Sequence, residues 1–326
     1  MRVPPWRHCW RPVRIPSRPP QDRLRTLEAV LRGAPAGTYE TYRHAVRAVA
    51  RANPSDEALL RAYIAALPSG HDPLGDAIFL AKADRPGFAP GTRAQIAHAR
   101  AVALRIIGEA DAARRIALRH VDAWASQAAD LMLLLTGIYA QEASDGTIAA
   151  DKRFYYRNLE ARGAERALAT PPLVANAQPR LGFLSACFDQ ESYMPLAHPL
   201  FAALDQNAVE TFLLPLGGTG VLKATEAALP AGSIHPVPAL TFATENDPAA
   251  WRAAAAYIRA LDLDLLVDMD DVLGPFSARL LMMRPARRQA TWFNMSGPNP
   301  DPSVDYVLGY ESLYPAGDPA YDGKIV

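Results

Sequence analysis

The spacing of apolar residues along the chain changes near residue 179. From Gln21 to about Ala169 the apolar positions follow a helical period, as in Leu24, Leu27 and Leu31. Proline and glycine residues separate these periodic segments and stop each helix. The pattern predicts a helical region with further helices over residues 39–52, 57–67, 92–107, 110–123, 130–142 and 150–168.

After residue 179 the apolar residues come in short runs that alternate with helical segments. The pattern predicts strands over residues 181–185, 210–214, 234–237, 263–267, 289–293 and 304–308. It predicts helices over residues 195–204, 222–229, 248–261 and 276–283. Alternating strands and helices favour βαβ units, a parallel sheet and a Rossmann-like lobe, so the expected fold class is α/β.

The expected domain organisation is a disordered leader over residues 1–20, a helical domain over 21–169 and an α/β lobe over 179–326. The leader holds five arginines and six prolines but no apolar core of the kind that a secretory signal needs. Residues 97–121 place small side chains on both sides of a turn at Gly108, as in a tetratricopeptide hairpin. A generic alanine-rich hairpin explains the same pattern equally well.

The composition indicates the compartment and the classes of partner of the protein, but not its chemistry. Only Cys9 and Cys187 are present, which excludes a disulfide framework and makes a reducing cytoplasm the expected compartment. No apolar run reaches the roughly 20 residues of a membrane helix, and we expect neither a membrane nor a nucleic-acid partner. The residues up to Gln178 include 25 basic and 17 acidic side chains, and those after it 9 and 17. Arginine greatly outnumbers lysine, a bias typical of a GC-rich bacterial genome.

The most specific motif lies near the end of the sequence. Arg284-Pro285-Ala286-Arg287-Arg288-Gln289 leads into a segment that starts at Trp292 and reaches Asp305-Tyr306. These residues resemble the R-P-A-P-x-Q, W-x-G-Y-P-G-T-x-G and D-Y motifs of the O-GlcNAc transferase-like glycosyltransferases, family 41, without a gap from Trp292 to Tyr306. Tyr321 to Val326 resembles the family's Y-S-E-K segment. The resemblance covers about residues 179–326.

The resemblance implies the first lobe of a GT-B-type glycosyltransferase, preceded by tetratricopeptide-like helices. Such an enzyme moves GlcNAc or a related hexose from a UDP-sugar to a protein side chain, without a metal or another cofactor. Its second lobe, which holds most of the UDP-sugar, would follow this sequence, so we expect the isolated chain to be inactive. The alternative is a catalytically silent module that binds a protein partner through its helical front. Fold resemblance alone does not decide between them.

Ligands of parallel sheets bind beyond the carboxyl ends of the strands, and three loops there hold the candidate site residues. In the first loop Ser185 and Phe188 fit the family's S-S-D-F-x-x-H-P motif, and Glu191 takes the place of its first histidine. The resemblance therefore makes Glu191 the candidate catalytic base, with a solvated loop glutamate as the alternative.

The second loop, Asp268-Met269-Asp270-Asp271, resembles the family's [ND]-M-N-G segment and makes Asp270 a candidate substrate contact. Its three carboxylates also suit a hard metal ion, although helix capping explains them more simply and we expect no metal site. The third loop keeps one glycine of the family's G-Y-P-G-T. Its candidate substrate contacts are Asn294, Ser296, Gly297, Pro298 and Asn299.

Overall fold

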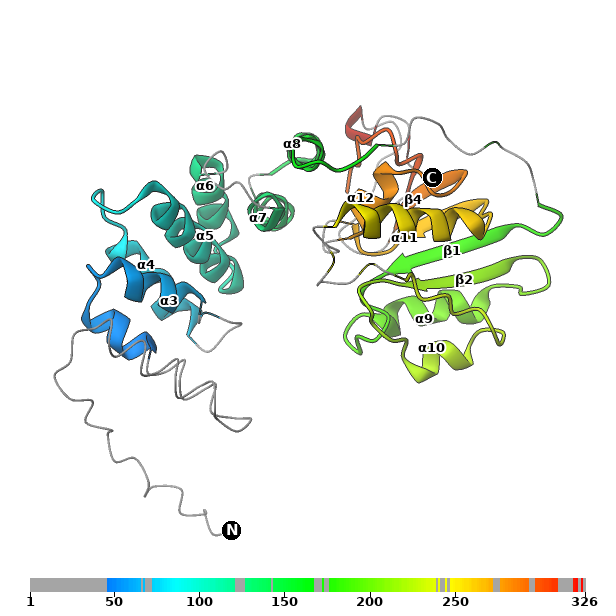
Figure 1. Cartoon of the computed structure of the whole chain (residues 1–326), viewed down its shortest axis with the longest axis horizontal. Helices are drawn as coiled ribbons and strands as arrows, with labels where there is room; N and C mark the ends of the chain where they lie inside the picture. The colour runs from blue at the N-terminus through cyan, green and yellow to red at the C-terminus, as the bar shows by residue number, and fades with distance from the viewer. Residues whose placement is uncertain are drawn as a thin grey trace, which may run out of the picture. The chain divides into compact units, whose positions relative to one another are not determined.

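The computed structural model describes residues 46–65, 67, 72–120, 127–141, 143–166, 172, 176–238, 240, 244, 247–271, 276–292, 297–309, 319–321 and 324. The predicted leader over residues 1–20 lies outside this part of the chain. The described residues fall into two compact units, one up to Glu109 and the other from Ala110 onward, and Figure 1 shows both.

The first unit is helical. Residues 46–52 form a helical turn and are followed by α3 (Glu57–Ala65), α4 (Pro73–Ala83) and α5 (Pro90–Ile106). Its core consists of buried aliphatic and aromatic side chains from all four segments, including Val46, Leu59, Leu60, Tyr63, Leu80 and Ile96. Burial of these side chains holds together helices that would be marginal alone.

Helix α4 is missing from the sequence prediction. Pro73 stands in the first turn of this helix, where proline is tolerated because its missing N–H has no partner there anyway. The Asp72 side chain caps this turn by accepting a hydrogen bond from the Gly75 N–H.

The second unit begins with three helices, α6 (Ala110–His120), α7 (Gln127–Tyr139) and α8 (Asp145–Ala161). Helix α8 starts at a capping box formed by Ser144 and Thr147. Leu134 of α7 and Tyr155, Tyr156 and Leu159 of α8 pack with two side chains of the α/β lobe, Ala278 and Met282. Helices α7 and α8 therefore share a core with the lobe.

The lobe is built on a five-stranded sheet with every neighbouring pair parallel. Its strands are β1 (Arg180–Ser185), β2 (Glu210–Pro215), β3 (Leu265–Asp268), β4 (Arg288–Trp292) and β5 (Tyr306–Leu308), in the spatial order β2-β1-β3-β4-β5. This confirms the predicted α/β class. The strand predicted over residues 234–237 is wrong: only one bridge, between Leu213 and Ile234, forms there.

Helices cover both faces of the sheet (Figure 1). One face packs with α9 (Met194–Ala203) and α10 (Lys223–Ala227), the other with α11 (Pro248–Ala260) and α12 (Ser277–Met282). Neighbouring strand residues enter opposite cores: Phe183 packs on the first face and Leu184 on the second. Burial on both faces explains why the strands appear in the sequence as continuous apolar runs. A short 3₁₀ turn, Pro319–Tyr321, follows the last strand.

Candidate functional site

The strand order creates a switch point between β1 and β3. From β1 the sheet extends to β2 on one side and to β3, β4 and β5 on the other. In open parallel sheets, the loops that leave the carboxyl ends of two such strands diverge and form a crevice where ligands bind. Here the loops after β1, β3 and β4 carry the candidate residues.

Asp270 connects the ends of β1 and β3. Its side chain is fully buried, and its two carboxylate oxygens accept hydrogen bonds from the Ser185 hydroxyl and from the Ala186 N–H at 2.6 Å. Burial raises the pKa of Asp270 to about 6, although both hydrogen bonds favour the charged form. The Tyr193 hydroxyl ties the same two loops by donating to the Met269 carbonyl. Asp270, a predicted substrate contact, therefore links the loops that follow β1 and β3.

Asp271 joins the third loop through a lysine from helix α8. Lys152 has no exposed side-chain surface, and its Nζ lies 2.6 Å from Asp271 Oδ2 and 3.4 Å from the Gly297 carbonyl oxygen. Asp271 has a φ of 44°, in the left-handed region that Asp tolerates better than most residues. Burial raises the pKa of Asp271, and the Lys152 charge opposes that shift.

Asp268 is the most isolated of the three carboxylates in this loop. It is fully buried and accepts a hydrogen bond from the Asp270 N–H at 3.0 Å. Burial, and then the charges of Asp270 and Asp271, raise its pKa well above the usual range. Since the three carboxylates turn to different partners, they do not form a shared ligand set, and no group of three metal-ligating side chains occurs among the described residues.

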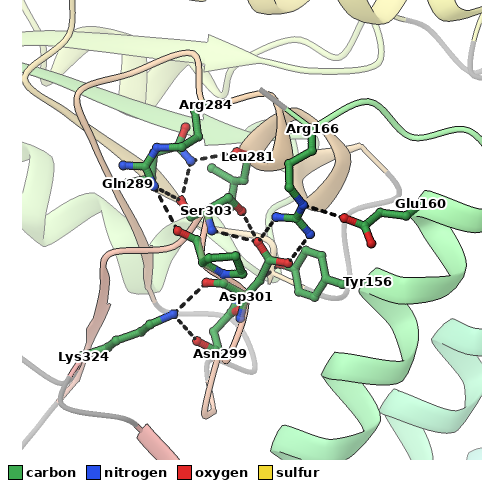
Figure 2. A network of polar contacts seen from close by, with 11 residues as sticks. Tyr156, Glu160, Arg166, Leu281, Arg284, Gln289, Asn299, Asp301, Ser303 and Lys324 are labelled. Atoms are coloured by element: carbon green, nitrogen blue, oxygen red, sulfur yellow. Dashed lines mark hydrogen bonds and ion pairs between the residues drawn. The ribbon is translucent and has the colours of Figure 1, made fainter. Parts of the chain in front are cut away.

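The loop after β4 is held by polar contacts on every side, as Figure 2 shows. Asn299 is buried and donates to the Tyr156 hydroxyl at 3.3 Å. Asp301 accepts two hydrogen bonds from Arg166, at 2.9 and 3.0 Å, and these bonds raise the pKa of the arginine. Lys324 Nζ contacts the carbonyl oxygens of Asn299 and Asp301 at 3.0 and 2.7 Å.

The remaining predicted site residues differ in their accessibility. Pro298 is buried and Gly297 half-buried, while Asn294 and Ser296 lie outside the described residues. Glu191 is exposed on the turn that leads into α9. Cys187 of the same loop is half-buried, and burial raises the pKa of its thiol to about 12. The first loop is hydrogen-bonded to the β3 loop directly, the third is connected to it through Lys152, and Glu191 is exposed to solvent in the first.

The residues that sequence analysis missed come from α8 and the segment after it, namely Lys152, Tyr156 and Arg166. They were assigned to the helical front, yet they contact the strand-end loops of the lobe. One signal was available: the chain has only four lysines, and two of them, Lys152 and Lys324, contact the loop over residues 297–301.

The arginine-rich motif before β4 has a structural role. Arg284 forms two hydrogen bonds to the Asp305 carboxylate and two to the carbonyls of Pro302 and Ser303. Gln289 donates to the Leu281 and Ser303 carbonyls. Arg287 pairs with Asp262 and Asp264, before the amino end of β3 and so opposite the strand-end rim. The motif fixes the turn from α12 into β4 and the approach to β5.

Comparison with solved structures finds the same fold in a mutant of the O-GlcNAc transferase of Thermobaculum terrenum. The two chains align with a TM-score of 0.65 and 18% sequence identity, over 94% of this chain and 56% of the other. This chain therefore spans about half the length of that transferase. No protein-family model and no curated protein matches the sequence. The part of the chain that the structure describes contains no helix long and apolar enough to cross a membrane. At this identity the comparison establishes a fold of the glycosyltransferase type.

Proposed function

We propose that this chain is part of a protein glycosyltransferase of the O-GlcNAc transferase type. The reaction would move GlcNAc or a related hexose from a UDP-sugar to a protein side chain. The observation that carries the proposal is the similarity of fold to a transferase of this type over 94% of the chain. The gapless motif from Trp292 to Tyr306 is independent support, since it was identified from the sequence alone.

In this proposal the chain supplies the acceptor side, and the donor is held mainly by a second lobe. Transfer of a sugar from UDP requires cations or N–H groups that stabilise the departing diphosphate. The cations that the described residues place at the rim are already engaged: Lys152 with Asp271, Arg166 with Asp301, and Lys324 with two backbone carbonyls. Arg284 and Arg287 are engaged in the framework away from the rim. We therefore expect no transfer by these 326 residues alone.

The test compares this polypeptide with the product of the whole reading frame that contains it. Each is mixed with radiolabelled UDP-GlcNAc or UDP-glucose and with a cell extract as the acceptor. We expect labelled protein from the full reading frame and only background from the 326-residue chain. If the full product labels nothing with either donor, the transferase proposal fails. Labelling by the shorter chain would contradict the need for a second lobe.

Glu191 is the proposed general base for the acceptor hydroxyl or amide. Positioned general bases contribute on the order of 10²–10⁴ in rate, so Glu191→Gln should lower kcat about a hundredfold or more in a labelling-competent protein. The matched control is Glu226→Gln, another exposed glutamate of the lobe. Equal rates in the two variants would remove Glu191 from the mechanism.

The second candidate is a silent module that binds proteins. The burial of the strand-end polar groups favours it, because Asp270 and the Lys152–Asp271 pair are bonded within the protein and not exposed to a ligand. A full reading-frame product that binds a defined protein partner but never labels it would establish this alternative. Labelling that depends on Glu191 would exclude it.

A further inference from the structure

A cavity of about 410 Å³ lies beside helix α8, between that helix and the loop Pro300–Pro302. Ala150, Arg153, Arg157 and Glu160 line it from successive turns of one face of the helix, at positions i, i+3, i+7 and i+10. Tyr156, Pro300 and Pro302 supply apolar wall, and Arg166 and Asp301 complete the lining. Its volume is in the range of small-molecule sites.

Charge inside this cavity is divided into a paired and an unpaired part. All three guanidinium nitrogens of Arg166 are engaged, two with Asp301 and Nε with Glu160 at 2.5 Å (Figure 2). Arg166 thereby engages both carboxylates of the lining. Within the described chain no carboxylate pairs with Arg153 or Arg157, and Arg157 only stacks near Phe154, with 6.0 Å from Cζ to the ring centroid.

Two exposed arginines one helical turn apart form a receptor for an oxyanion. Their planar guanidinium groups can each donate two parallel hydrogen bonds, the geometry that phosphate and carboxylate oxygens accept. The helix spacing places their Cβ atoms about 6 Å apart, so both side chains can reach one anion. The proline and tyrosine wall gives the apolar part of such a ligand a surface to cover.

We propose that this cavity binds a phosphate monoester attached to a flat apolar group. The phosphate would lie between Arg153 and Arg157, and the apolar group would lie against Tyr156, Pro300 and Pro302. A dianion suits two arginines better than a carboxylate does, because each guanidinium then meets a full charge. The cavity adjoins the loop after β4, but Arg153 and Arg157 are not among the strand-end candidate residues, and the proposal does not depend on the transferase proposal.

The test is a calorimetric titration of the purified chain with phenyl phosphate at low ionic strength, where screening of charges is weakest. Inorganic phosphate and phenol are titrated as the two halves of the ligand. We expect saturable binding of phenyl phosphate, weaker binding of inorganic phosphate and no measurable binding of phenol. Each of Arg153→Gln and Arg157→Gln should weaken phenyl phosphate about tenfold, as expected for loss of one charged hydrogen-bonding group.

Two further variants locate the site. Ala150→Phe fills the cavity from an exposed helix position without removing charge, and it should abolish binding. The matched control is Arg115→Gln with Arg119→Gln, an exposed pair at the same spacing on α6 and outside the lining, which should leave the affinity unchanged. The proposal fails if phenyl phosphate does not saturate, if the α6 pair matters as much as the α8 pair, or if inorganic phosphate binds equally well.

Discussion

Three aspartates of one loop show how strongly the environment of a residue decides its role. Asp268, Asp270 and Asp271 are all buried, but their partners differ. Asp268 accepts hydrogen bonds from backbone N–H groups, Asp270 from the Ser185 hydroxyl and a backbone N–H, and Asp271 pairs with Lys152. Sequence could identify the carboxylates and their place after a strand. It could not identify these partners, since Ser185 and Lys152 are 85 and 119 positions away in the chain.

The raised pKa of Asp270 predicts a pH dependence of stability. Its folded-state pKa of about 6 exceeds the roughly 3.9 of an unfolded aspartate, so the fold favours the protonated form. The stability from this group is complete below pH 3.9 and is lost as pH rises through 6, by about 3 kcal/mol in all. Relative to the wild type, Asp270→Asn should therefore gain about 2 kcal/mol of unfolding free energy between pH 4 and pH 7.5.

Urea unfolding at a series of pH values measures this difference. Glu191→Gln serves as the control, because it removes one negative charge from an exposed position of the neighbouring loop. A constant difference between Asp270→Asn and the wild type would show that Asp270 ionises with the same pKa in the folded and unfolded states. A similar trend in the control would attribute the effect to net charge.

Sequence period placed most elements of the lobe within about two residues but said little about how they pack. The apolar runs are long enough to predict the strands from the sequence, and the helices between them imply parallel pairing. Residues 234–237 were wrongly predicted as a strand because a short apolar run does not reveal whether a partner strand is free. Helix α8 was predicted as part of the front, since nothing local shows that its Lys152 and Tyr156 reach the lobe.

The packing of α6, α7 and α8 predicts that Gly137→Ala destabilises the protein, whereas helix propensity alone would predict a gain in stability. Arg114 of α6 and Asp151 of α8 form a buried ion pair at 2.5 Å, and Gly137 of α7 lies against it. A Cβ at Gly137 would stand 2.6 Å from Arg114 Nη1 and 2.8 Å from Asp151 Oδ2. Gly137→Ala should gain up to about 1 kcal/mol of propensity but disturb a pair whose loss costs about 3–5 kcal/mol.

We therefore expect Gly137→Ala to lower the unfolding free energy by about 2 kcal/mol or more in chemical denaturation. Gly91→Ala is the matched control, because Gly91 is also helical and its Cβ would meet nothing within 4 Å. The control should be neutral or slightly stabilising. If Gly137→Ala is also neutral, the three helices have room that the structure does not show.

At the scale of the whole molecule, the division into units differs from the one that composition suggests. Hydrophobic period and charge both change near residue 179, whereas the compact unit that holds the sheet begins at Ala110. The hydrophobic period of a segment indicates only whether it forms a helix or a strand. Membership of a unit depends on contacts, and here these include the Lys152–Asp271 and Arg166–Asp301 ion pairs, which join the helices to the sheet loops.

The unfolding of two fragments tests whether the folding unit of the sheet begins at residue 110 or at residue 179. Residues 110–326 keep both ion pairs and the packing of α8 on Ala278 and Met282, and they should unfold in one cooperative transition. Residues 179–326 leave the buried Asp271 without its lysine, at a cost of about 3–5 kcal/mol, which is a large share of the 5–15 kcal/mol stability of a typical domain. This shorter fragment should lose near-ultraviolet circular dichroism or unfold at much lower urea concentration.

Asp271→Asn in the shorter fragment separates lost charge pairing from lost packing. Asparagine tolerates the left-handed backbone at this position and removes the unpaired charge, so it should restore part of the stability. In residues 110–326 the same substitution leaves the buried Lys152 without its carboxylate partner and should lower the stability of the fragment. Opposite signs in the two fragments would therefore assign the helices to the folding unit of the sheet through this ion pair. If both fragments unfold at the same urea concentration, the lobe folds without α8, and residue 179 is the boundary that matters.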